Sequence, residues 1–158
     1  MNYHNITKDD MLNGDGLRVV LWVAGCTHHC QGCQNPITWD VGGGIPFDDA
    51  AEKELFEALN RPHVSGITFS GGDPLHPFNR EEVFRLIKKI RTELPQKTIW
   101  LYTGFLWEEI KDIPETMNSL KTERIDYYWL LDYGFKVFGI HPNAYGNNCH
   151  LILFVKAL

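Results

Sequence analysis

Three cysteines lie within eight residues of this sequence, at Cys26, Cys30 and Cys33, directly after an apolar segment. Thiolates this close in sequence can bind one metal centre, and soft sulfur ligands suit an iron–sulfur cluster or zinc. A cubane cluster has four irons, and each iron needs a ligand besides its sulfides. Three cysteines therefore leave one iron open to a ligand from outside the protein, which predicts a reactive centre.

The cysteine segment leaves other kinds of site open. A zinc site would take its fourth ligand from His28, His29 or Cys149, but such sites usually contain a second cysteine pair, and only one C-x2-C pair is present. An electron carrier would close its cluster with four cysteines and so would need the distant Cys149. A cluster with three cysteine ligands is favoured, and we expect the two histidines to be polar, exposed loop residues.

A second segment that could bind a ligand is Gly71-Gly72-Asp73, which follows an apolar stretch ending at Phe69. Glycines at the end of a strand let the backbone approach a ligand closely because no Cβ intervenes. The Asp73 carboxylate can accept a charge-assisted hydrogen bond from an ammonium group. The same residues are common in ordinary turns. Next to an open metal site, ligand binding is the better interpretation.

Strand-like and helix-like patterns alternate along the chain, which predicts a mostly parallel sheet with right-handed crossovers. The predicted strands cover residues 17–24, 64–69, 98–102 and 125–131, with an edge strand at 151–155. Three helices are predicted. The first begins after a cap at Asp48 or Asp49, the second begins after a cap at Asn79, and the third covers residues 105–113.

Ligands of parallel sheets bind at the carboxyl ends of the strands. The cysteine loop follows the first predicted strand, Gly71-Gly72-Asp73 follows the second, and Thr103-Gly104 follows the third. We therefore expect these three segments to meet at one edge of the sheet and to build one site.

Composition narrows the class of protein. A chain of 158 residues with 44% apolar and 13% aromatic residues most simply forms one globular domain. A formal charge of −5 argues against nucleic-acid binding, and no apolar run approaches the roughly 20 residues that a membrane span needs. The N-terminal residues show no signal pattern, and crowded cysteines indicate metal chemistry in a reducing compartment. We expect a cytoplasmic protein with neither nucleic-acid nor membrane partners.

The two segments together resemble the radical S-adenosylmethionine (SAM) superfamily. There, a C-x3-C-x2-C loop holds a 4Fe–4S cluster, and a later glycine-rich motif ending in an acidic residue holds the methionine part of SAM. Within the superfamily, the chain is most similar to the activating enzymes of anaerobic (class III) ribonucleotide reductases. The motifs that carry this resemblance are Asn13-Gly14-Asp15-Gly16, residues 23–35, Thr38-Trp39, residues 70–75 and Tyr102-Thr103-Gly104-Phe105.

The resemblance implies a reaction with defined cofactors and partners. Cys26, Cys30 and Cys33 would bind three irons of one 4Fe–4S cluster, and the amino and carboxylate groups of SAM would bind the fourth. An electron from a flavodoxin-type reductant would cleave SAM to methionine and a 5′-deoxyadenosyl radical. That radical would remove a hydrogen atom from a glycine of the large subunit of the anaerobic ribonucleotide reductase.

The resemblance also implies which residues contact SAM, and it implies no catalytic side chain beyond the cluster ligands. The methionine moiety would be held by Gly71, Gly72 and Asp73. The backbone near the adenine would belong to Gly32, Cys33 and Gln34.

The fold that the resemblance implies is a partial, TIM-like β/α barrel with a mostly parallel sheet, formed as a single domain over residues 1–158. The likeness runs from about Asn2 to Ile113, and from about Trp129 the sequence departs from the family. Residues 129–158 would thus form a divergent tail. The alternative within the superfamily is an activase of another glycyl-radical enzyme, such as pyruvate formate-lyase.

Overall fold

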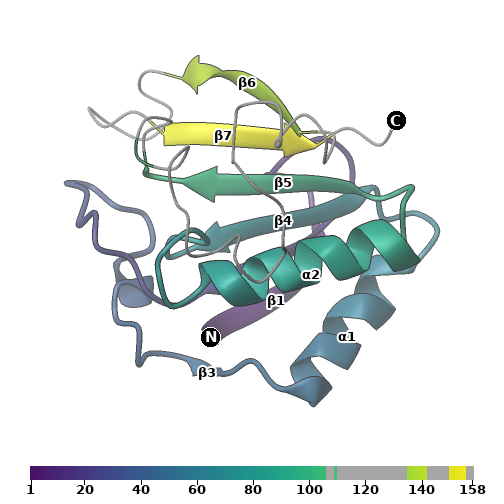
Figure 1. Cartoon of the computed structure of the whole chain (residues 1–158), viewed down its shortest axis with the longest axis horizontal. Helices are drawn as coiled ribbons and strands as arrows, with labels where there is room; N and C mark the ends of the chain where they lie inside the picture. Colours follow the sequence, from purple (N-terminus) through teal and green to yellow (C-terminus); the bar gives the residue numbers. More distant parts are fainter. Residues whose placement is uncertain (106–108, 110–134, 142–149, 156–158) are drawn as a thin grey trace, which may run out of the picture.

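A computed structural model describes residues 1–105, 109, 135–141 and 150–155, the last two segments by their backbone. Seven strands form one sheet in the order β3-β1-β2-β4-β5-β7-β6 (Figure 1). The strands are β1 (Asn2–Asp10), β2 (Arg18–Val23), β3 (Ile45–Pro46), β4 (Gly66–Gly71), β5 (Thr98–Thr103), β6 (Phe135–His141) and β7 (His150–Val155). The helices are the short 3-10 helix η1 (Pro36–Thr38), α1 (Asp49–Leu59) and α2 (Arg80–Glu93).

Strands β2, β4 and β5 run parallel, and they confirm the predicted strands at 17–24, 64–69 and 98–102. The pairs β1–β2, β1–β3, β5–β7 and β6–β7 are antiparallel. The predicted mostly parallel, TIM-like barrel is therefore wrong: the sheet is mixed, and it does not close within the described residues. Antiparallel neighbours need only a short connection, such as the one from β1 to β2, whereas each parallel pair needs a long crossover.

Two antiparallel parts of the sheet were not anticipated correctly. Strand β1 was not predicted, because only Tyr3 and Ile6 of its nine residues are buried and its apolar signal is weak. Strand β7 confirms the predicted strand at 151–155, but its edge position is wrong because β6 pairs with its outer side. The predicted strand at 125–131 and nearly all of the helix at 105–113 lie outside the described residues.

The core lies between the sheet and the two helices, with α2 running across the front of the sheet in Figure 1. The parallel register places apolar residues of neighbouring strands side by side, and these residues alternate along each strand as period two requires. The two rows are Val19, Ile67 and Ile99, and Leu21, Phe69 and Leu101. The predicted inner face of α2, Val83, Leu86, Ile87 and Ile90, is confirmed as part of this core. Among the described helices, none is long and apolar enough to cross a membrane.

Arg18 holds the amino ends of the three parallel strands together on the other face of the sheet. Its guanidinium is fully buried and donates to the side chains of Thr68 at 2.7 Å and Thr98 at 2.9 Å, and to the carbonyl oxygen of Asp15 at 3.0 Å. Burial lowers the pKa of Arg18 to about 10. The Asn13–Gly16 motif thus covers a buried cation at the end of the sheet opposite to the cysteine loop.

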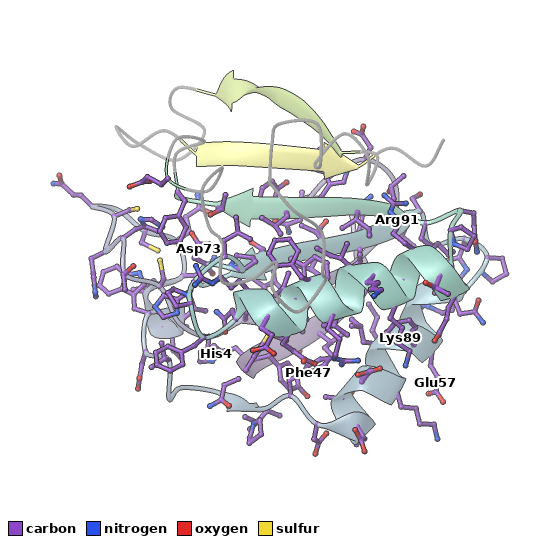
Figure 2. All side chains as sticks on the ribbon, in the orientation of Figure 1. His4, Phe47, Glu57, Asp73, Lys89 and Arg91 are labelled. Atoms are coloured by element: carbon purple, nitrogen blue, oxygen red, sulfur yellow. The ribbon has the colours of Figure 1, made fainter. Side chains whose placement is uncertain are left out.

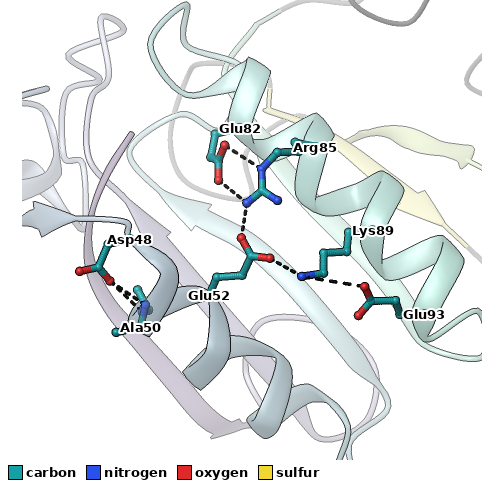
Figure 3. Close-up of polar contacts among 8 residues, drawn as sticks. Asp48, Ala50, Glu52, Glu82, Arg85, Lys89 and Glu93 are labelled. Carbon is teal, nitrogen blue, oxygen red and sulfur yellow. Dashed lines mark hydrogen bonds and ion pairs between the residues drawn. The ribbon is translucent and has the colours of Figure 1, made fainter.

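The predicted cap of α1 is confirmed as Asp48, whose carboxylate accepts from the backbone N–H groups of Ala50 and Ala51 at 3.0 Å. Beyond the cap, Glu52 joins α1 to α2 (Figure 3). Its carboxylate pairs with Arg85 and lies 2.5 Å from Lys89 Nζ. The hydrogen bond from Arg85 lowers the pKa of Glu52, so the pair stabilises the fold above the carboxylate's ordinary pKa of 4.5.

We predict that Glu52→Gln lowers the free energy of unfolding by about 0.5–1 kcal/mol at pH 7, because it removes one charge from a partly buried ion-pair network. The difference from the unmodified protein should shrink as the pH falls below the ordinary carboxyl pKa and through the lowered one. Urea unfolding at pH 7 and at acid pH measures both effects. Glu57→Gln is the matched control, because its Lys53 partner is 3.7 Å away and both side chains are largely exposed. Equal effects of the two variants would contradict the prediction.

Candidate functional site

The loops that follow β2, β4 and β5 meet at one end of the sheet, as the sequence predicted. The Asp73 backbone N–H donates to the carbonyl oxygen of Gly25 at 2.8 Å, which joins the end of β4 to the start of the cysteine loop. The Thr103 hydroxyl, at the end of β5, donates to the Asp73 carboxylate at 2.9 Å. Figure 2 shows Asp73 at the end of the molecule where sulfur atoms gather. One residue therefore links three strand ends.

The Asp73 carboxylate is buried, with 2% of the residue exposed, and it is surrounded by donors. Its Oδ1 accepts from the Leu75 N–H at 2.8 Å, and its Oδ2 accepts from the Gly104 N–H at 2.8 Å. His28 Nε2 lies 2.9 Å from Oδ2, and the Thr103 hydroxyl completes the set. A carboxylate offers about four lone-pair positions, so these four donors fill them. The ligand ammonium contact expected of Asp73 stays a prediction.

His28 is not the exposed loop residue that the sequence suggested, and that prediction is wrong. Its side chain is 21% exposed and pairs with Asp73. The hydrogen bond to Asp73 raises the pKa of His28. Its ring lies edge-on to Phe105, with ring centroids 4.6 Å apart. His29 is exposed as predicted, and its ring meets Trp39 at 4.6 Å. Neighbouring histidines of one loop thus have different environments, which no spacing rule could have distinguished.

The three cysteines are free thiols, each partly buried. The Cys26 N–H donates to the Trp39 carbonyl oxygen at 3.0 Å, which closes the base of the loop. Cys33 Sγ accepts from the Asn35 N–H at 3.4 Å, an interaction of the kind that tunes iron–sulfur clusters. Burial raises the pKa of the Cys26 thiol, and the nearby Asp73 carboxylate raises it further. Three thiolates here need a cationic core to offset their charge, which a cluster's iron provides.

Within the described residues, no three His, Cys, Asp or Glu side chains converge as ligands of a single metal ion would. In a cubane cluster each cysteine binds a different iron, so its thiolates are spread around the core. The donor set, three soft cysteine sulfurs in one loop, fits a cluster with three protein ligands.

Gly71 and Gly72 pack tightly against the protein's own backbone. A Cβ on Gly72 would lie 2.5 Å from the Gly25 carbonyl oxygen and 2.9 Å from that of Thr38. Gly71 has a φ of +100°, and a Cβ there would lie 2.8 Å from the Val23 carbonyl oxygen. The two glycines thus allow β4 to end directly against the base of the cysteine loop. Their expected contact with a methionine moiety stays a prediction.

Gly32 and Gln34, which flank Cys33, are both exposed. Gly32 has a φ of +78°, and apart from its chain neighbours no atom of the described residues lies within 4 Å of where its Cβ would be. These residues form the exposed side of the loop, and their expected place beside an adenine stays a prediction.

Asn79 and His76 were not assigned to the site from the sequence, yet both are buried and donate to the Asp73 carbonyl oxygen. Asn79 stands before α2, but the prediction that its side chain caps the helix is wrong. Its amide instead donates to the carbonyl oxygens of Ala24 at 2.7 Å and Asp73 at 3.0 Å. The start of α2 is thereby fixed to the bases of both loops.

The chain matches the family model of the 4Fe-4S single cluster domain over residues 12–131, so it belongs to that class of iron–sulfur proteins. It is 45% identical over 113 residues to the anaerobic ribonucleoside-triphosphate reductase-activating protein of Enterobacteria phage T4, with 72% of each chain covered. The protein of that name from Escherichia coli K12 is 45% identical over 112 residues, covering 70% of this chain and 73% of the relative. The one from Salmonella typhi is 43% identical over 134 residues, covering 84% and 87%.

The chain therefore belongs to the family of anaerobic ribonucleoside-triphosphate reductase-activating proteins. The resemblance seen in its sequence motifs is confirmed.

We predict that Gly72→Ala lowers the free energy of unfolding by about 1–3 kcal/mol, because the new methyl group must push the base of the cysteine loop away. The variant should also bind less iron on reconstitution. Denaturant unfolding of the metal-free protein and iron analysis measure the two effects. Gly42→Ala is the control: its Cβ would lie 3.4 Å from Asp40 Oδ1, an ordinary contact, and we expect a change within about 0.5 kcal/mol. A Gly72→Ala protein as stable as the control would contradict the packing argument.

Proposed function

We propose that this protein is a radical SAM activase that generates a glycyl radical on the anaerobic ribonucleotide reductase. The observation that carries the proposal is the C-x3-C-x2-C loop anchored at the ends of three parallel strands, in a chain of the reductase-activating family. Three cysteines leave one cluster iron for a ligand such as SAM.

In this proposal, Cys26, Cys30 and Cys33 bind the 4Fe–4S cluster. When bound, the cluster would supply the electron that cleaves SAM to methionine and a 5′-deoxyadenosyl radical, which takes a hydrogen atom from the reductase glycine. The chain's own residues supply orientation and exclusion of water. Gly71, Gly72 and Asp73 shape the end of β4 for the methionine moiety.

The remaining contacts belong to the exposed side of the cysteine loop. The backbone of Gly32, Cys33 and Gln34 is proposed to lie beside the adenine, where exposure leaves it free for a ligand. A flavodoxin-type protein is the proposed electron donor, and the reductase large subunit is the proposed substrate. We place the protein in the cytoplasm, because a reducing compartment keeps its thiols available for iron.

The proposal is tested by anaerobic reconstitution with iron and sulfide, followed by reduction in the presence of SAM. We expect 5′-deoxyadenosine as a product, and a glycyl-radical signal in electron paramagnetic resonance (EPR) once the anaerobic reductase is added. Absence of 5′-deoxyadenosine from protein with a full complement of iron and sulfide would refute the SAM chemistry. A radical on pyruvate formate-lyase and none on the reductase would reassign the substrate.

Cysteine variants separate this enzyme from an electron carrier. Cys26→Ser should lose most of its iron and all cleavage of SAM, because one of three ligands is removed. Cys149→Ser should keep both the cluster and the activity, since three cysteines suffice for the proposed centre. Loss of the cluster in Cys149→Ser would instead indicate a carrier with four cysteine ligands. Iron and sulfide analysis of both variants gives the answer.

A further inference from the structure

The cysteine loop is attached to Asp73 at two points. The first is the hydrogen bond from the Asp73 backbone to the Gly25 carbonyl oxygen at 2.8 Å, just before Cys26. The second is the contact of 2.9 Å between His28 Nε2 and Asp73 Oδ2, in the middle of the C-x3-C segment. The other donors to this carboxylate come from Leu75, Thr103 and Gly104, outside the cysteine loop. Among the donors to Asp73 in the described part of the chain, His28 alone therefore connects the carboxylate to the residues between Cys26 and Cys30, two of the proposed iron ligands.

The position of the His28 ring is also determined by shape. A Cβ on Gly104 would lie 2.6 Å from His28 Cδ2, so the ring sits where only a glycine leaves room. Phe105 meets the ring edge-on, with planes 74° apart. The neighbouring His29 also meets an aromatic ring, that of Trp39, but it is exposed and it contacts neither Asp73 nor Gly104 among the described residues. Three separate contacts from the end of β5 and from Asp73 thus specify one orientation of His28.

We propose that His28 is a positioning residue that fixes the cysteine loop relative to the SAM site at the ends of β4 and β5. This inference deepens the proposed function and rests on it. The cysteine ligands decide whether a cluster binds, whereas His28 decides where that cluster is held with respect to Gly71, Gly72 and Asp73. Because misplacement by about 1 Å can cost a reaction a hundredfold, a second attachment of the loop has a direct consequence for SAM.

The filled lone pairs of Asp73 suggest a competing idea, in which His28 only occupies the place of the SAM ammonium until SAM arrives. The packing of the ring against Gly104 and Phe105 favours a permanent attachment, since a residue that must leave needs no fitted surroundings. The two ideas predict opposite changes in SAM affinity when His28 is removed. Removal of a positioning residue weakens SAM binding, whereas removal of a competitor strengthens it.

The experiment compares His28→Ala, His28→Gln and His29→Ala with the unmodified protein, each reconstituted with iron and sulfide. Glutamine keeps an N–H donor near the position of Nε2, and His29→Ala is the matched control in the same loop. Iron and sulfide per chain report cluster binding. SAM is then added in steps while the EPR spectrum of the reduced cluster is recorded. The measured quantity is the SAM concentration that gives half of the full spectral change.

For His28→Ala we expect nearly normal iron and sulfide, and a half-maximal SAM concentration raised roughly tenfold or more, because a loop that is no longer fixed misplaces the cluster relative to SAM. His28→Gln should return to within about threefold of the unmodified protein, and His29→Ala should match it. An unchanged or lowered SAM concentration in His28→Ala would overturn the proposal. If His28→Ala binds less iron, the His28→Gln variant distinguishes the outcomes. Iron content and SAM response restored to those of the unmodified protein support the proposal. A loss in His28→Gln equal to that in His28→Ala overturns it. Absence of any spectral change with SAM in the unmodified protein would refute the proposed function itself.

Discussion

The site depends on one buried carboxylate. Asp73 lies at the end of β4, and its side chain gathers donors from its own turn, from the end of β5 and from the cysteine loop. A buried carboxylate is costly unless its lone pairs are satisfied, so the energy of that group forces these segments together. The geometry of the cysteine loop is therefore a consequence of satisfying Asp73, as much as of the cysteines themselves.

The opposite end of the sheet is fixed in a similar way by a buried cation. Arg18 reaches across β2, β4 and β5 and is satisfied by hydroxyl and carbonyl oxygens, with its guanidinium 5.5 Å from the centre of the Trp100 ring. The burial of Arg18 explains the Asn13–Gly16 motif, because a Cβ on Gly14 would lie 2.8 Å from its side chain. The three parallel strands are thus held at both ends by buried charged groups with full sets of partners, while the apolar rows between them pack against α1 and α2.

The outer strands of the sheet, β1, β3, β6 and β7, are all paired antiparallel to their neighbours. Strand β1 is mostly polar, and it is joined to β2 by backbone pairing and by the burial of Tyr3 and Ile6 in the core. The hairpin of β6 and β7 adds to β5 in the antiparallel sense, although the alternation of strands and helices earlier in the chain favours a continued parallel sheet. The family resemblance predicted a TIM-like barrel. The described sheet instead contains three parallel strands, with antiparallel strands added on both sides.

The sequence by itself determined the three cysteines as candidate iron ligands, the parallel strands β2, β4 and β5, both main helices and the convergence of three loops. Each of these depends on local signals, such as cysteine spacing, apolar periodicity and glycines after a strand. The tertiary structure alone decided that His28 and not His29 reaches Asp73, that Asn79 fixes two loops instead of capping α2, and that β1 joins the sheet. The two side-chain contacts join residues distant in sequence, since His28 and Asp73 are 45 residues apart and Asn79 and Ala24 are 55 apart. The choice among chemically equal side chains is made only when the fold brings one of them within hydrogen-bond distance.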